Sequence, residues 1–182
     1  MKKAIFTFGL ISGVLSAGLM AINITLIGDH GAKGLLFGYT AMVLSFLLVY
    51  FGIRSYRDSV GGGEITFGKA FGIGISITLI SCVFYVVAWE ILYFNFLPGF
   101  MDNYAAHAIE GMKKAGASAA AIQAKAEEMK HFKAMYDNPL INAAMTFIEP
   151  FPVGLLISLL SAVVLRKKGA GGGVEAGLPA AS

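Results

Sequence analysis

The sequence has a single cysteine among its 182 residues, and only 14% of the chain is charged. Cys82 cannot form an internal disulfide, and its apolar neighbours predict a small buried side chain rather than a redox or metal site. Soluble domains carry roughly a quarter charged residues, so this low share excludes disorder and most soluble folds. The net charge of +3 does not indicate nucleic-acid binding, because the basic residues cluster at the ends of apolar stretches. We therefore expect a membrane protein with no nucleic-acid partner.

Four long apolar stretches predict an all-α polytopic membrane protein with four transmembrane helices. They cover about residues 4–27, 35–53, 70–93 and 140–165. At about 1.5 Å per residue, each can cross a hydrocarbon core of roughly 30 Å. Two lysines before the first stretch also suit a signal peptide, but the stretch is longer than a signal core and is interpreted as a retained span. Residues 1–168 are the predicted membrane domain, and the Gly- and Ala-rich residues 169–182 are a predicted disordered tail.

The basic residues also predict the orientation, because lysine and arginine beside a span resist translocation. With four spans, eight of them fall on one side: Lys2, Lys3, Arg54, Arg57, Lys69, Arg166, Lys167 and Lys168. The long segment between the third and fourth spans holds five lysines, but long segments translocate with little regard to charge. We therefore expect a multi-pass protein of the bacterial cytoplasmic (inner) membrane with both termini in the cytoplasm.

The segment between the third and fourth spans is the one stretch able to form structure in water. Apolar residues recur at helical spacing from Met101 to Met112, and a rougher stripe runs from Ile122 to Tyr136. Gly116 interrupts the pattern between them. This predicts an extracytoplasmic helical hairpin over about residues 100–137. Its core is too small to fold alone, so it should lie on the membrane, on the span ends or on another subunit.

Small residues recur at every fourth position in three of the spans, and each series forms a flat stripe on one helix face. Such stripes let helix backbones approach closely in lipid. They predict helix packing within the chain or, as an alternative, a contact between copies of the chain or with another membrane protein. The stripes comprise Gly9, Gly13, Ala17 and Ala21 in the first span, Gly68, Gly72 and Ser76 in the third, and Gly154, Ser158 and Ala162 in the fourth.

Motifs of known enzymes are incomplete. Residues 63–69 match a phosphate-binding loop, but Ala70 replaces the Ser or Thr that would hold magnesium, and no buried strand precedes them. Intramembrane proteolysis needs a catalytic His, paired aspartates or a zinc motif inside the spans. All histidines fall outside them: His30, His107 and His131. His131 with Glu127 and Glu128 is interpreted as a solvated helix face. We expect no metal, no cofactor and no enzymatic activity.

Two acidic residues are candidates for an intramembrane polar site. Glu90 lies near the outer end of the third span, where an interfacial charge is the simplest interpretation. Glu149 lies roughly 13 Å into the fourth span, where an isolated charge is costly and a protonated or partnered carboxyl is expected. Pro150 and Pro152 follow it, and each removes a backbone donor. We therefore expect a kinked helix with free carbonyls beside Glu149.

This arrangement has two interpretations. A carboxyl beside free carbonyls is how membrane proteins build cation or proton sites. The structural alternative is that the fourth span begins after Leu140 and Glu149 caps its outer end, or that Glu149 pairs with Asn23 or Tyr39. In the first case Glu149 should face a polar cavity, and in the second it should be enclosed in a pair or lie at the outer interface.

Four local strings together resemble a known family. They are GIRSYRD at 52–58, GGEITFGKAF at 62–71, NPL at 138–140 and EPFPVGL at 149–155. They resemble the bacterial membrane proteins of the domain-of-unknown-function family four-one-nine-nine, over about residues 2–168. The resemblance implies a small four-span membrane protein and assigns no activity, substrate or catalytic residue.

We expect a protein of the lipid bilayer that is not an enzyme. It is expected to act by packing its helices against another copy of the chain or against a membrane partner. The alternative is a small ion- or proton-coupled transporter subunit centred on Glu149, whose small-molecule or ion ligand is unknown.

Overall fold

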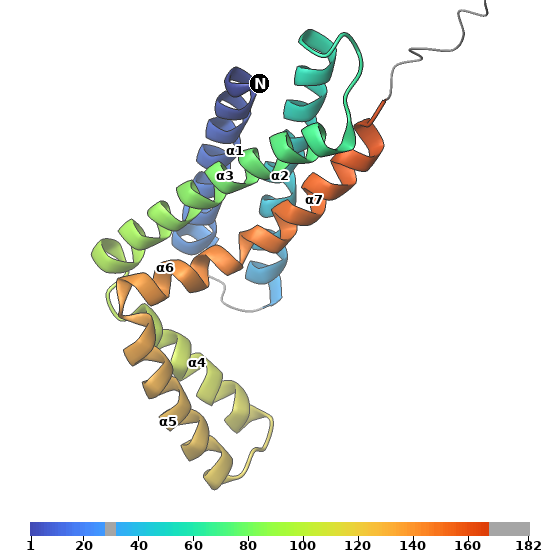
Figure 1. The fold of residues 1–182 in the computed structure, drawn as a ribbon. Coiled ribbons are helices and arrows are strands. Elements are labelled where there is room, and N and C mark those ends of the chain that lie inside the picture. The colour runs from blue at the N-terminus through green and yellow to red at the C-terminus, as the bar shows by residue number, and fades with distance from the viewer. Residues whose placement is uncertain (28–31, 168–182) are drawn as a thin grey trace, which may run out of the picture.

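The computed structural model describes residues 1–27 and 32–167, and in this part of the chain the regular structure is helical. The predicted tail, Lys168 and His30 lie outside the described residues. The elements shown in Figure 1 are α1 (Lys2–Ile22), the short π-helix η1 (Asn23–Ile27), α2 (Ala32–Ser59), α3 (Phe67–Phe96), α4 (Phe100–Lys114), α5 (Ala119–Tyr136), α6 (Pro139–Ile148) and α7 (Pro150–Leu165).

Four of these segments are long and apolar enough to cross a membrane: Lys2–Thr25, Lys33–Ser59, Phe67–Phe96 and Pro139–Leu165, the last made of α6 and α7. The predicted all-α fold class with four spans is therefore confirmed. The second helix continues to Ser59, beyond the predicted end at Ile53, so Arg54 and Arg57 extend it rather than follow it. Long basic side chains at a span end can reach the headgroup region while the helix continues.

The core lies around α3, which packs against α1, α2, α6 and α7. Its fully buried side chains include Ile73 and Ile77, which meet Phe46, Val49 and Ile53 of α2 in one cluster. Hydrogen bonds also join the spans, because unpaired polar groups are costly in lipid. The Ser12 hydroxyl donates to the Ser45 carbonyl (2.9 Å), and the hydroxyls of Thr78 and Ser158 are hydrogen-bonded at 3.0 Å.

Local sequence fixes where the fourth span begins. Asn138 caps α6, since its side-chain oxygen accepts from the backbone N–H groups of Leu140 (3.0 Å) and Ile141 (3.4 Å). Pro139 occupies the first helical position, where a missing N–H costs no hydrogen bond. The helical segment therefore begins at Pro139, before Leu140, and Glu149 lies at the junction of α6 and α7, in the N-cap position of α7.

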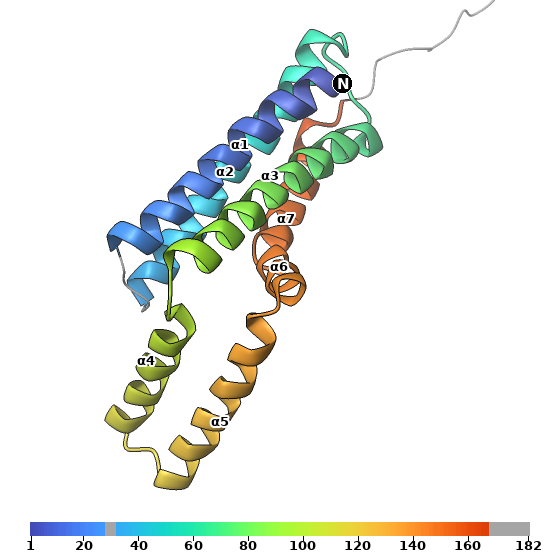
Figure 2. The ribbon, with the colours of Figure 1, turned by 90° about the vertical axis from the view of Figure 1, so that its left-hand side faces the viewer.

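Figures 1 and 2 show the N-terminus, the loop between α2 and α3 and the end of α7 at one end of the bundle. Backbone hydrogen bonds of 3.0 Å between Ile65 and Lys167 join that loop to the chain after α7. The seven described basic residues of the predicted cytoplasmic side lie in these segments or in the helical turns next to them. At the opposite end α4 and α5 form a helical hairpin, with Gly116 (φ 75°) in the turn between them.

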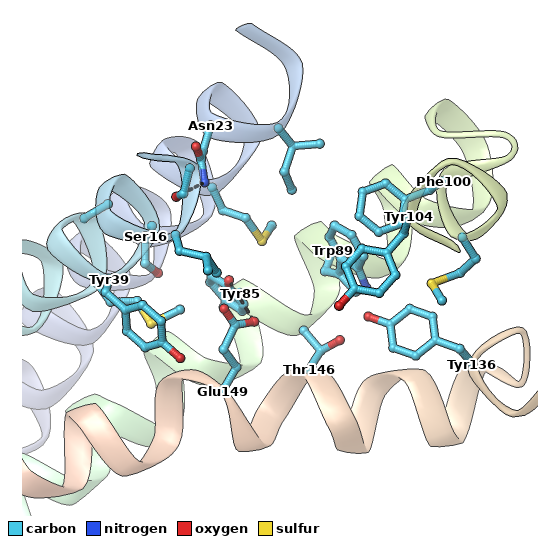
Figure 3. A pocket seen from close by; sticks show the side chains of 18 of the residues that line it. Ser16, Asn23, Tyr39, Tyr85, Trp89, Phe100, Tyr104, Tyr136, Thr146 and Glu149 are labelled. Atoms are coloured by element: carbon cyan, nitrogen blue, oxygen red, sulfur yellow. Dashed lines mark hydrogen bonds between the residues drawn. The ribbon is translucent and has the colours of Figure 1, made fainter. Parts of the chain in front are cut away.

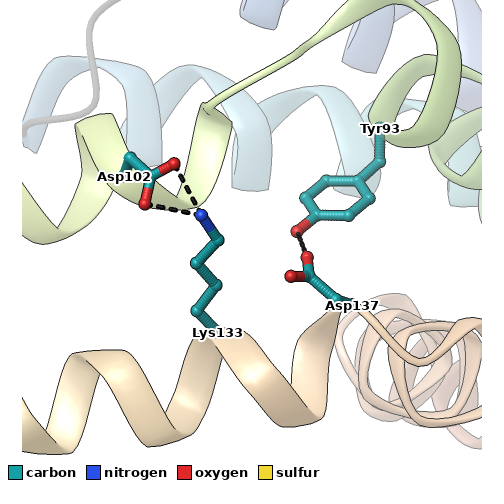
Figure 4. A network of polar contacts seen from close by, with 4 residues as sticks. All are labelled: Tyr93, Asp102, Lys133 and Asp137. Atoms are coloured by element: carbon teal, nitrogen blue, oxygen red, sulfur yellow. Dashed lines mark hydrogen bonds and ion pairs between the residues drawn. The ribbon is translucent and has the colours of Figure 1, made fainter.

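Two polar contacts tie the base of this hairpin together, as Figure 4 shows. The Lys133 ammonium of α5 contacts both carboxylate oxygens of Asp102 in α4, each at 2.6 Å. The hydrogen bond with Asp102 raises the pKa of Lys133. The Tyr93 hydroxyl at the end of α3 donates to Asp137 Oδ1, also at 2.6 Å. The first contact joins the first turn of α4 to the last turns of α5, and the second joins the end of α5 to the third span.

Candidate functional site

The small-residue stripes of α1 and α7 lie against other helices of the chain. A Cβ atom added to Gly9 would lie 3.0 Å from Ile80, and one added to Gly13 would lie 2.8 Å from Phe84, both in α3. A Cβ atom on Gly154 would collide with the Thr78 side chain. Ser158 beside it is fully buried, and Ala17 is half-buried. Close backbone approach in this chain therefore depends on the first and fourth stripes.

The stripe of α3 behaves differently. Gly68 and Gly72 have open space where a Cβ atom would be, with no atom within 4 Å. The hydroxyl of Ser76 donates to the Gly72 carbonyl of its own helix at 2.7 Å. The two glycines of this stripe are exposed and take no part in packing among the described helices, in contrast to the other two stripes, and Ser76 is half-buried. The stripe lies on the outer surface of the bundle.

The fourth span breaks at Glu149. The α-helical hydrogen-bonding pattern ends at Ile148 and resumes at Pro150, while Glu149 keeps helical backbone angles (φ −69°, ψ −58°). Pro150 and Pro152 lack the N–H groups that would bond to the carbonyls four residues earlier, which accounts for the interruption. Pro150 is fully buried and Pro152 is exposed. The break presents the Glu149 side chain toward α3.

The partner of Glu149 is a residue that the sequence did not indicate. The Tyr85 hydroxyl of α3 donates to Glu149 Oε2 at 3.3 Å. Tyr85 is only 6% exposed, whereas Glu149 is exposed on the side of a cavity that both residues line. Asn23 and Tyr39, the partners considered from sequence, line the same cavity, but within residues 1–27 and 32–167 neither is hydrogen-bonded to Glu149. The structure thus brings three of the sequence candidates to one place.

The cavity has a volume of about 390 Å³ and lies where α1, η1, α2, α3 and the fourth span meet the base of the hairpin. Figure 3 shows Glu149, Tyr85 and Tyr39 on one side of it and a group of aromatic side chains on the other. It is lined by Ser16, Met20, Asn23, Ile24, Gly34, Leu35, Gly38, Tyr39, Ala41, Met42, Tyr85, Trp89, Phe100, Met101, Tyr104, Phe132, Tyr136, Thr146 and Glu149. Among these described residues, Glu149 is the one with a charged side chain.

The aromatic wall comes from α3 and the hairpin. Trp89 and Phe100 meet nearly at right angles, with ring centroids 5.2 Å apart and an interplanar angle of 79°. Phe132 and Tyr136 stack at 5.5 Å on α5. Burial raises the pKa of the Tyr136 hydroxyl, while the nearby Thr146 and Trp89 oppose that shift. Tyr136 is therefore a neutral donor at physiological pH.

Two polar atoms at this site are buried without a hydrogen bond. Asn23 donates through Nδ2 to the Gly34 carbonyl (3.2 Å), but its Oδ1 has no partner among the described residues. Trp89 Nε1 lies near the Tyr136 hydroxyl, yet it makes no hydrogen bond of acceptable geometry in that part of the chain. An unsatisfied buried polar atom costs about 1–3 kcal/mol, so the two atoms are a local cost to the fold beside the cavity.

Glu90 is separate from this cavity. It lies six residues before the end of α3, is half-buried and does not line the cavity. Its Oε1 is buried and has no hydrogen-bond partner among the described residues. The two acidic candidates therefore do not form one site.

A signal in the sequence could have indicated the α3 side of the cavity. Tyr85, Trp89 and Tyr93 are spaced four residues apart and so share one helix face, and all three are at least 92% buried. Aromatic residues with polar tips at such a depth usually bond to a partner. The aromatic residues of the hairpin could not be assigned to the cavity in this way, because their position depends on how the hairpin joins the spans.

The fold and cavity define a helical membrane protein with four spans and a polar site between them. Comparison with family models places the chain in the family described as protein of unknown function (DUF4199), whose model matches residues 7–167. The chain belongs to this family, which confirms the resemblance seen in the sequence. No curated protein and no solved structure matched the chain.

Proposed function

We propose that this protein is a non-enzymatic membrane protein that binds a small ligand or ion in the cavity beside Glu149, as a transporter subunit does. The observation that carries the proposal is the position of Glu149, an acidic residue inside a candidate span that faces a cavity and has no cationic partner in the described chain. The alternative of a purely structural pair would enclose the carboxyl between its partners, whereas Glu149 lines the cavity.

The energetics support a ligand. A carboxylate inside a membrane span costs several kcal/mol unless a charge, a proton or several hydrogen bonds compensate it. The Tyr85 hydroxyl supplies one hydrogen bond, and at 3.3 Å it is a long one. An ionised carboxylate can accept about four. The remaining acceptor capacity faces the cavity, where an ion, a proton or a ligand group can reach it.

The proposed orientation places the hairpin and the cavity toward the outside and both termini in the cytoplasm of a bacterial cell. Seven of the described basic residues lie toward the end of the bundle opposite the hairpin, which supports this orientation. A ligand would then enter the cavity from the extracytoplasmic side, at the base of the hairpin.

Cysteine labelling tests whether the cavity is open to water. Thr146 lines the cavity and is 5% exposed, whereas Ser158 in the same span has no exposed surface, packs against Thr78 and lines no part of the cavity. Thr146→Cys should react with a small cationic methanethiosulfonate reagent, and Ser158→Cys should not. The unmodified protein is the baseline, because Cys82 is fully buried. Equal resistance of both variants would contradict a water-accessible binding cavity.

Self-association is a second candidate, favoured by the stripe of Gly68, Gly72 and Ser76, which faces away from the bundle. Flat glycine surfaces let helices of neighbouring copies approach closely. The two proposals are compatible, since the stripe and the cavity share no residue. The sequence predicted that the protein acts by helix packing with another chain, and this remains a proposal for the face that carries this stripe.

A further inference from the structure

We infer that the ligand of this cavity is a small organic ammonium ion, held by the Glu149 carboxylate and by the aromatic rings opposite it. The inference rests on the proposed function and names the class of ligand. The shared chemistry, an ammonium group on a short chain, occurs both in free amines and in zwitterionic lipid headgroups. The cavity of about 390 Å³ falls within the usual range for small-molecule sites, roughly 300–1,000 Å³.

The charge of the cavity selects a cation. Glu149 carries the one charged side chain among the described lining residues, and no described lysine, arginine or histidine lines the cavity. The five ion pairs formed by the described side chains lie elsewhere, and none includes Glu149. An anionic ligand would meet like charge there, whereas a cation would supply the missing counter-charge.

The aromatic wall selects an organic cation rather than a bare metal ion. Rings of tyrosine, tryptophan and phenylalanine attract an ammonium placed over their faces, within about 6 Å of the centroid. Trp89 and Phe100 meet at 79° and so form a corner, and Figure 3 shows Tyr104 and Tyr136 beside them. Metal ions instead need several oxygen, nitrogen or sulfur ligands, and no cluster of three His, Cys, Asp or Glu occurs among the described residues.

Polar side chains that line the cavity fit the rest of such a ligand. Tyr39 and Tyr104 both line it, and a phenol hydroxyl can accept a hydrogen bond from an N–H or O–H group or donate one to a hydroxyl or ester oxygen. A short amino alcohol or its phosphate ester carries groups of both kinds beside the ammonium. Met20, Met42 and Met101 supply flexible apolar contacts for its carbon chain.

The single tryptophan of the chain allows a direct test, because Trp89 lines the cavity and its fluorescence reports on this site alone. The purified full chain in nanodiscs of phosphatidylglycerol would be titrated with choline and with 3,3-dimethylbutan-1-ol, which has nearly the same shape but no charge. Choline should change the fluorescence with an affinity at least about tenfold higher than that of the neutral alcohol, since loss of a charge-assisted contact costs roughly that factor.

Variants assign the effect to particular residues. Glu149→Gln should lower choline affinity about tenfold or more and leave the alcohol unaffected. Glu90→Gln is the matched control, because Glu90 is an acidic residue of the neighbouring span that does not line the cavity. Tyr104→Leu should weaken choline binding about twofold to tenfold through loss of a ring. Its control is Phe94→Leu, since both side chains are 44% exposed and Phe94 lies outside the cavity.

The same titration in phosphatidylcholine nanodiscs distinguishes the two sources of the ammonium group, a lipid headgroup and a free amine. If the headgroup is the ligand, the lipid occupies the cavity and free choline no longer changes the fluorescence; if the ligand is a free amine, choline binds equally in both lipids. Either result supports an ammonium site. Equal affinity for choline and the neutral alcohol, or unchanged choline affinity in both Glu149→Gln and Tyr104→Leu, would overturn the inference. The proposed cavity would still stand in that event if Thr146→Cys is labelled.

Discussion

The Tyr85 hydroxyl donates a hydrogen bond to Glu149 Oε2 at 3.3 Å and so joins the third span to the break in the fourth. Tyr85 is enclosed by the bundle, while Glu149 is exposed to the cavity. Tyr85 therefore has a structural role in the pair, and Glu149 remains available to a ligand. The tyrosine positions the carboxylate, and the carboxylate keeps acceptor capacity for something else.

Substitutions at this pair should separate its two roles. Glu149→Gln keeps a hydrogen-bond acceptor for Tyr85 and should unfold in detergent close to the parent. Glu149→Leu leaves the Tyr85 hydroxyl buried without a partner and should cost about 1–3 kcal/mol in the free energy of unfolding. Denaturant titration followed by far-UV circular dichroism measures both.

A double-mutant cycle provides the control for this loss. Once Tyr85→Phe has removed the hydroxyl, Glu149→Leu should cost about 1 kcal/mol less than it does in the parent. Strictly additive losses would show that the 3.3 Å contact contributes no stability.

Replacing glycine by alanine should have opposite effects on stability at a packed glycine and at an exposed one. Gly154→Ala places a methyl group against Thr78 in the core and should destabilise the protein by about 1–3 kcal/mol. Gly72→Ala meets open space and should stabilise the helix by about 0.5–1 kcal/mol. Unfolding titrations in detergent compare the two variants.

The Gly72 variant also tests self-association. If copies of the chain pack through this stripe, Gly72→Leu should lower the dimer fraction measured by cross-linking in membranes, while the monomer keeps its stability. Gly18→Leu makes the same change at another exposed glycine with open space around it, in α1, and serves as the control. A dimer fraction unchanged by Gly72→Leu would argue against this face as the contact.

The four spans could be predicted from sequence because the signal is local. A helix needs about 20 consecutive apolar residues to cross a bilayer, and these residues are adjacent in the sequence. The break at Glu149 was likewise predictable, since Pro150 and Pro152 remove specific backbone donors. The stripe at Gly9 and Gly13 could be recognised from its spacing, although its partners, Ile80 and Phe84, could not.

The partner of Glu149 could not be predicted, because Tyr85 lies 64 positions away and meets it through the rotation of α3 about its axis. That rotation is set by packing against four neighbouring segments at once. The same reason explains the stripe of Gly68 and Gly72. Its spacing is that of the other stripes, and only the packed bundle shows that it faces outward.

The orientation can be tested by labelling from outside intact cells. Ser59 and Ala119 are both exposed and lie at opposite ends of the structure, Ser59 at the end of α2 and Ala119 at the start of α5. With cytoplasmic termini, Ala119→Cys should react with an impermeant thiol reagent, and Ser59→Cys should react only after the cells are permeabilised. The reverse pattern would place the hairpin in the cytoplasm.

The base of the hairpin should depend on a buried contact more than on an exposed one. Tyr93 is 8% exposed, and its hydroxyl donates to Asp137 at 2.6 Å, just before the fourth span begins. Tyr93→Phe removes this donor while keeping the ring, and should cost about 1–2 kcal/mol in the free energy of opening the hairpin base. Hydrogen exchange of the amides between Phe132 and Asn138, followed by mass spectrometry, should accelerate accordingly.

Lys133→Met is the control for that experiment, because its ion pair with Asp102 is equally short but lies in solvent. Water and salt screen such a pair, and holding two long side chains together offsets much of the attraction, so exchange should change little. Since Phe132 and Tyr136 line the cavity, loosening this base by Tyr93→Phe should also weaken choline binding. Faster exchange with unchanged binding would mean that the hairpin is not a wall of the binding site.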